Sequence, residues 1–184
     1  RAARTLNKKA SIVINNPTSS VRPLMDAFLQ NSDYDGKMFV TSQEAREMVD
    51  ENSMVVVVDT NRPSYTECPE LLKMTRTIVV LDHHRQGSEV IQNAVLSYIE
   101  PYASSACEMV AEILQYFAEG VRVKNIEADS LYAGIMIDTN NFMAKTGVRT
   151  FEAAAFLRRC GADVTRIRKL FRENIENYRA KGEA

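Results

Sequence analysis

Two short apolar runs, each followed directly by an aspartate, constrain this chain more than any other feature. The run 54–58 reads MVVVV before Asp59, and the run 77–81 reads TIVVL before Asp82. Uninterrupted runs of β-branched residues are typical of parallel strands that are buried on both faces. Because ligands bind outside the carboxyl ends of such strands, we expect the residues after these runs to form a site.

His83 and His84 follow Asp82 directly, and they are the only two histidines in the chain. Imidazole binds divalent transition metals and transfers protons near neutral pH, so this pair indicates a site rather than a solvated loop. Successive side chains at a strand end point to different sides, so we expect one histidine to ligate a metal and the other to face the substrate. Asp82 is either a partner that fixes a histidine tautomer or an ordinary turn residue.

A third apolar run, LYAGIMID at 131–138, also ends on an acid, Asp138. Its alanine and glycine favour a buried helix that delivers Asp138 from its end, with a strand as the alternative. Asp59 and Asp138 are each explained singly as a cap or turn residue, but their joint appearance predicts a shared site. Two or three carboxylates with one imidazole suit Mn²⁺ or Fe²⁺ and, less well, Mg²⁺, and they exclude all-sulfur zinc coordination.

The composition fits one ordinary globular domain, which we assign to residues 1–184. The chain is 45% hydrophobic and 26% charged, with a formal net charge of -1, so we expect no duplex nucleic acid as a partner. Its three cysteines lie far apart and predict reduced cytosolic thiols. No apolar run is long enough to cross a bilayer, so we expect no membrane contact by this part of the protein.

Strands alternate with helices, which predicts a three-layer α/β fold with a mostly parallel sheet flanked by helices. The expected strands are 11–15, 37–40, 54–58, 77–81 and, less regularly, 94–99. The expected helices are 21–31, 42–50, 69–74, 106–117, 126–137, 150–160 and 163–179, after a helix tail in 1–9. We expect Ser20 or a neighbour to cap the helix 21–31, and Thr41 or Ser42 to cap the next.

Three further polar residues are candidates for substrate contacts. Ser104 and Ser105 precede the helix 106–117, where free backbone amides and hydroxyls can meet an anion. Plain N-capping is the alternative for both serines. Arg149 opens another helix and can hold a phosphate, with an ordinary surface arginine as the alternative.

Four stretches between Met54 and Arg158 carry a family resemblance: VVVVDTNRPS, IVVLDHHR, EPYASSACEMV, and GIMIDTNNF followed by GVRTFEAAAFLR. The chain resembles the DHH phosphoesterase family, and more narrowly its bacterial membrane-anchored cyclic-di-AMP phosphodiesterases. The resemblance implies a two-metal Mn²⁺ hydrolase that opens this cyclic dinucleotide to pApA.

The same resemblance assigns roles to the site residues. It implies that Asp59 bridges two metal ions, that His83 and Asp138 ligate one of them, and that His84 contacts the scissile phosphate. His84 is therefore an expected catalytic residue, and Asp82 is the other because its place in the sequence suits a partner that fixes a histidine tautomer. Ser104, Ser105 and Arg149 are the expected further substrate contacts.

The resemblance is incomplete at both ends. Family members begin with a strand that ends in His-x-x-Pro-Asp-x-Asp, and they carry a C-terminal domain with a base-binding motif; neither is present here. We therefore expect an N-terminally truncated DHH-type domain with at most one well-formed metal site, inactive alone. The parent protein is expected to be anchored in the bacterial membrane with this domain on the cytoplasmic side.

The missing strand would lie between the strands 11–15 and 54–58, so we expect these two not to pair directly. The open edges would be covered by the parent chain, by a homodimer or by local rearrangement. Alternative functions are a DHH exonuclease, nanoRNase or pyrophosphatase, and a non-catalytic binding or assembly module. The stretch EPYASSACEMV favours the cyclic-dinucleotide group.

Overall fold

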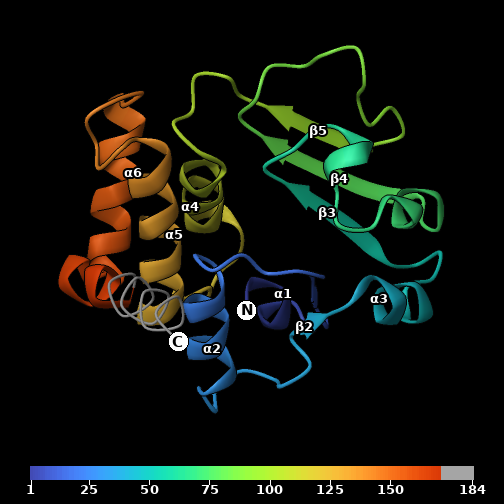
Figure 1. The fold of residues 1–184 in the computed structure, drawn as a ribbon, viewed down its shortest axis with the longest axis horizontal. Coiled ribbons are helices and arrows are strands. Elements are labelled where there is room, and N and C mark those ends of the chain that lie inside the picture. Colours follow the sequence, from blue (N-terminus) through green and yellow to red (C-terminus); the bar gives the residue numbers. More distant parts are fainter. Residues whose placement is uncertain (171–184) are drawn as a thin grey trace, which may run out of the picture.

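The computed structural model describes residues 1–170 of the chain (Figure 1). Its elements are α1 (Ala2–Thr5), β1 (Ile12–Val13), α2 (Arg22–Leu29), β2 (Phe39–Val40), α3 (Ser42–Met48), β3 (Met54–Val58), η1 (Pro63–Tyr65), η2 (Pro69–Lys73), β4 (Thr77–Asp82), β5 (Leu96–Ile99), α4 (Ala106–Tyr116), α5 (Asn125–Asp138) and α6 (Val148–Arg159). Residues 164–170 are also helical. The predicted α/β fold with parallel strands flanked by helices is confirmed.

The strands β3, β4 and β5 form one parallel sheet in that order. Side chains alternate between its two faces, and on one face Ile78 and Val80 of β4 are fully buried. They form an apolar cluster with Val57, Leu72 and Ile91. This cluster holds the ends of β3 and β4 side by side, and the predicted site residues follow those ends.

The opposite face of the sheet is open at β3. Met54, Val56 and Val58 are exposed to 60, 51 and 43% in the described structure. The prediction that these strands are buried on both faces is therefore wrong for β3 within residues 1–170. A run of β-branched residues predicts a strand. Whether both faces of that strand are buried depends on which other elements cover them.

The strands β1 and β2 form a separate parallel pair, and β1 does not pair with β3. Within residues 1–170 the outer edge of β3 has no partner strand. Hydrogen bonds connect the end of β1 to α3 and to the loop before η2. The Nδ2 atom of Asn15, just after β1, donates to Oγ of Ser42 at 2.8 Å and to the backbone O of Glu67 at 2.9 Å.

The helices α4, α5 and α6 pack together beside the sheet, and the arrowheads of β3, β4 and β5 point toward them (Figure 1). Small residues and a few large ones fill their shared core: Ala111, Ala128, Ile135, Ala153 and Leu157. The ambiguous run before Asp138 is helical, so the strand alternative is wrong. Its glycine, Gly134, lies where α4 approaches so closely that a Cβ would overlap Sγ of Cys107.

The predicted N-cap is present in α3 and absent in α2. Thr41 caps α3, as expected, and Glu44 also completes a capping box. The helix α2 begins after Val21 without a side-chain cap, so the prediction for Ser20 is wrong. Proline in the first turn of α2 lacks an N–H group, and the N–H groups of Val21 and Arg22 donate to the backbone O of Thr18 instead.

Two other helices differ from the prediction in extent. The expected helix 69–74 is the 3₁₀ segment η2, which is typical of so short a connection. The expected helix 163–179 is described only to residue 170, and its remainder lies outside the described residues. In the described part of the chain, every helix is too short or too polar to cross a membrane.

Candidate active site

Asp59 occupies the turn directly after β3. Its backbone φ is 68°, in the left-handed region that Asp and Asn adopt more readily than most residues. Its N–H group donates to the backbone O of Leu81 at 2.9 Å, which fastens this turn to β4. The Asp59 side chain therefore lies beyond the C-terminal end of β3.

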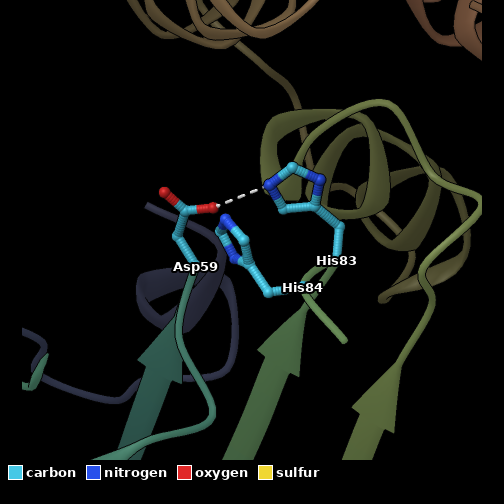
Figure 2. Close-up of side chains that lie close together, drawn as sticks. All are labelled: Asp59, His83 and His84. Carbon is cyan, nitrogen blue, oxygen red and sulfur yellow. Dashed lines mark ion pairs between the residues drawn. The ribbon is translucent and has the colours of Figure 1, made fainter. Parts of the chain in front are cut away.

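His83 faces Asp59 across the ends of β3 and β4 (Figure 2). Its Nε2 atom lies 3.3 Å from Oδ1 of Asp59 and 4.0 Å from Oδ2 of Asp138. The imidazole of His83 is largely buried, whereas more than half of the Asp59 side chain is exposed. The three residues predicted as metal ligands therefore lie around one point.

Negative charge accumulates at this point. Asp138 is the last residue of α5, whose last turn contains no basic residue. A helix C-terminus carries partial negative charge, which disfavours a carboxylate there. Burial raises the pKa of Asp59, the His83 imidazole opposes this shift, and the Asp138 carboxylate adds to it. A cation between the two acids would relieve their repulsion.

His84 lies beside His83, contrary to the prediction that the two side chains separate. The ring centroids are 4.3 Å apart. The backbone N–H of His84 donates to Oδ1 of Asp82 at 3.2 Å, and Nδ1 of its ring lies 2.8 Å from the same oxygen. Because β4 ends at Asp82, strand alternation no longer fixes the side chains beyond it, and these contacts turn His84 back.

The residues present fit a divalent cation. Ligand atoms of Asp59, His83 and His84 lie within 4.8 Å of one another, with Asp138 next to them. Carboxylate oxygen and imidazole nitrogen together suit Mn²⁺ or Fe²⁺. Since Nδ1 of His84 faces Asp82, only Nε2 of that ring is available to a metal or a substrate.

A match with known proteins decides the family. Residues 4–135 match the DHH family, N-terminal domain. The chain belongs to the DHH family. It is 40% identical over 180 residues to the cyclic-di-AMP phosphodiesterase GdpP of Bacillus subtilis (strain 168). The aligned region covers 97% of this chain and 27% of GdpP. It is 44% identical over 142 residues to the cyclic-di-AMP phosphodiesterase PdeA of Listeria monocytogenes serotype 1/2a (strain 10403S), covering 77% of this chain and 22% of PdeA.

A solved structure shares the fold of this DHH domain. The exopolyphosphatase-related protein from Bacteroides fragilis superimposes with a TM-score of 0.71 at 16% identity, covering 92% of this chain and 49% of that one. At this identity the likeness concerns the fold alone. The chain spans about a quarter of the length of GdpP and of PdeA, 27% and 22% respectively.

Ser104 and Ser105 are buried at the start of α4 in this DHH domain. The Oγ atom of Ser105 accepts from the backbone N–H of Glu108 at 3.0 Å, and Oγ of Ser104 donates to the Glu108 carboxylate. Ser105 thus shows the N-capping alternative, whereas the Ser104 hydroxyl bonds the Glu108 side chain, so both hydroxyls are used within the fold. Their contact with substrate stays a prediction.

Arg149 is also engaged within the fold. Its Nε and one terminal nitrogen donate to the two carboxylate oxygens of Glu112 at 2.8 and 2.7 Å, and the guanidinium contacts Glu100 and the Tyr98 hydroxyl at 3.3 Å each. These bonds tie the start of α6 to α4 and to β5. A phosphate contact by Arg149 stays a prediction.

Sequence reasoning missed two buried polar residues next to the site. Asn61, two residues after Asp59, donates to Asp82. Thr139, which follows Asp138, bonds both α5 and the loop beyond it. Their only signal in the sequence is their position near expected ligands, because asparagine and threonine are common in any loop.

Proposed function

We propose that this DHH domain hydrolyses cyclic-di-AMP to pApA, with Mn²⁺, as part of a longer protein. The observation that carries the proposal is the convergence of Asp59, His83 and Asp138 on one point at the strand ends. The identity of 40% to GdpP over 97% of this chain supports the cyclic dinucleotide as substrate.

The side chains have separate roles in this proposal. Asp59 and His83, at the ends of two neighbouring strands, and Asp138, at the end of α5, would hold a metal ion. The Asp59 side chain is 59% exposed, so its carboxylate would also be accessible to a second ion. Bound divalent ions supply Lewis acidity toward the phosphoryl oxygens.

His84 and Asp82 act on the substrate side of the site. The His84 side chain is 58% exposed, whereas Asp82 is completely buried. His84 presents Nε2 to the scissile phosphate, and Asp82 orients the ring through Nδ1. Placement of a charged phosphate against a fixed imidazole is the contribution expected of this pair.

We infer that the isolated 184-residue chain has little or no turnover. In residues 1–170 the acids and histidines form one cluster with metal-ligand geometry. Two-metal hydrolysis stabilises both the attacking and the leaving oxygen, so a single ion site is not sufficient.

The test compares the longer protein with this chain, each supplied with Mn²⁺. Substrates are cyclic-di-AMP, short oligoribonucleotides and pyrophosphate, with Asp59→Asn as the inactive control. We expect the longer protein to prefer cyclic-di-AMP and the chain to be at least a hundredfold slower. Preference for oligoribonucleotides or pyrophosphate would establish one of the other DHH activities. Binding of cyclic-di-AMP without hydrolysis of any substrate would establish a non-catalytic module.

A further inference from the structure

Asn61 lies in the loop after β3, and its side chain points into the protein rather than to solvent. The residue is 3% exposed. Its Nδ2 atom donates to Oδ2 of Asp82 at 2.6 Å and lies 3.4 Å from the backbone O of His84. Its Oδ1 atom is buried and has no hydrogen-bond partner among the described residues.

Asp82 connects Asn61 to His84. Its two carboxylate oxygens divide between these neighbours: Oδ2 accepts from Asn61, and Oδ1 faces Nδ1 and the backbone N–H of His84. Asp82 is completely buried, and none of its hydrogen bonds in the described structure comes from lysine or arginine. A buried carboxylate is costly unless donors satisfy it, so Asn61 supplies what a cation would otherwise provide.

The orientation of the Asn61 amide follows from its neighbours. The reversed amide would place Oδ1 against a carboxylate oxygen, and two acceptors repel each other. The orientation that bonds Asp82 leaves Oδ1 buried without a partner, which is itself unfavourable. In the observed orientation Nδ2 of Asn61 donates to Asp82, although Oδ1 of Asn61 is then buried without a partner among the described residues.

We propose that Asn61 is a positioning residue for His84. By holding one oxygen of Asp82, Asn61 directs the other oxygen to the Nδ1 proton of His84 and so fixes both the ring orientation and its tautomer. A carboxylate only accepts hydrogen bonds, so Nδ1 carries the proton and Nε2 faces the open side of the site. The inference rests on the proposed function only for the role of Nε2 at the phosphate.

The side-chain and backbone hydrogen bonds of Asn61 can be tested separately. The backbone O of Asn61 accepts from the N–H of Ile91 at 2.9 Å, which holds the loop after His84 in place. The substitution Asn61→Ala keeps this bond and removes the donor to Asp82. A matched control is Asn93→Ala, because Nδ2 of Asn93 also donates across the fold, to the backbone O of Leu72 at 2.8 Å.

The experiment reads the imidazole nitrogens directly. The chain contains two histidines, so ¹⁵N labelling of histidine gives two ring systems, and the spectrum of His84→Ala assigns them. Long-range ¹H–¹⁵N spectra are recorded without metal or substrate, at a pH well above the ordinary pKa of histidine. The shift of each nitrogen then reports whether it carries the proton.

We expect His84 in the wild-type chain and in Asn93→Ala to show a protonated Nδ1 and an unprotonated Nε2. In Asn61→Ala the two shifts should move toward each other, because an unrestrained imidazole exchanges between tautomers. Wild-type His84 with the proton on Nε2 would overturn the proposal without any variant. Unchanged His84 shifts in a folded Asn61→Ala would overturn it too. Neither readout depends on hydrolysis. A failure of the positioning role of Asn61 can therefore be told apart from a failure of the proposed phosphodiesterase function.

Discussion

Gly134 on α5 lies directly against Cys107 on α4. A Cβ at residue 134 would overlap Sγ of Cys107 and stand 3.1 Å from its Cβ. We predict that Gly134→Ala destabilises the chain by about 1–3 kcal/mol through overpacking. This value is the net effect, after subtraction of the gain of about 1 kcal/mol that alanine normally brings to a helix interior. Urea denaturation measures the difference.

Two further variants identify the cause. Cys107→Ala removes the sulfur, so combining it with Gly134→Ala should recover most of the loss in a double-mutant cycle. Gly36→Ala is the matched control, because no atom lies within 4 Å of the added Cβ. Additive effects of the two substitutions would contradict steric overlap as the reason for the glycine.

The Cys107 thiol also predicts a dependence on pH. Burial raises the pKa of Cys107 to about 12 from an ordinary 9.0, and the Asp138 and Asp59 carboxylates add to the shift. Between these values the unfolded chain loses the thiol proton and the folded chain keeps it, so the free energy of unfolding falls as pH rises. Below the lower value this group contributes no pH dependence.

Denaturation curves recorded from neutral pH up to the alkaline limit of folding test this sign. We expect the wild-type chain to lose stability more steeply above pH 9 than Cys107→Ala does. The comparison cancels the lysines and tyrosines that titrate in the same range. Parallel curves for the two proteins would show that the thiol is not protected in the fold.

The two adjacent histidines are predicted to differ in metal binding. Nε2 of His83 lies between two carboxylates, whereas His84 has its Nδ1 engaged by Asp82. We expect the wild-type chain to bind one Mn²⁺, His83→Ala to lose this binding, and His84→Ala to keep it within a few-fold. Electron paramagnetic resonance of free Mn²⁺ measures the bound fraction.

Asp59→Asn is the informative companion variant, since asparagine tolerates the left-handed backbone at residue 59 as aspartate does. It should remove the negative ligand without adding backbone strain. Equal losses of Mn²⁺ affinity in His83→Ala and His84→Ala would instead make His84 a ligand, which the 4.8 Å cluster permits.

Thr139 is predicted to support Asp138 through the loop that follows it. Asn140, Asn141 and Phe142 have φ values of 48°, 57° and 65°, three consecutive left-handed residues. Such backbone persists only where its surroundings enforce it. The buried Oγ1 of Thr139 donates to the backbone O of Ile135 at 2.6 Å and accepts from the N–H of Phe142 at 2.9 Å.

Thr139→Val keeps the shape and removes both hydrogen bonds. We expect a loss of about 1–3 kcal/mol in stability, because the Phe142 N–H is left unpaired. Mn²⁺ affinity should fall about tenfold as Asp138 loses its support. Thr139→Ser keeps the hydroxyl and should retain most of the affinity. Wild-type Mn²⁺ affinity in Thr139→Val would show that the loop does not position Asp138.

The sequence by itself determined two neighbouring strands and the acids and histidines at their ends. The runs before Asp59 and Asp82 form neighbouring parallel strands, so the residues after them meet at one sheet edge. Asp138 joins them from the end of α5, and the alanines and glycine of this segment already favoured a helix over a strand. Local periodicity and residue type were sufficient because these features depend on short stretches of chain.

Only the tertiary structure decided which polar groups serve the site and which serve the fold. Asn61 reaches Asp82 across 21 residues, and Arg149 reaches Glu112 across 37. Such partners come from packing between elements, which residue type does not encode. The same holds for the open face of β3 and for the contact of Gly134 with Cys107: coverage and interhelical distance are properties of assembled elements, so no local pattern specifies them.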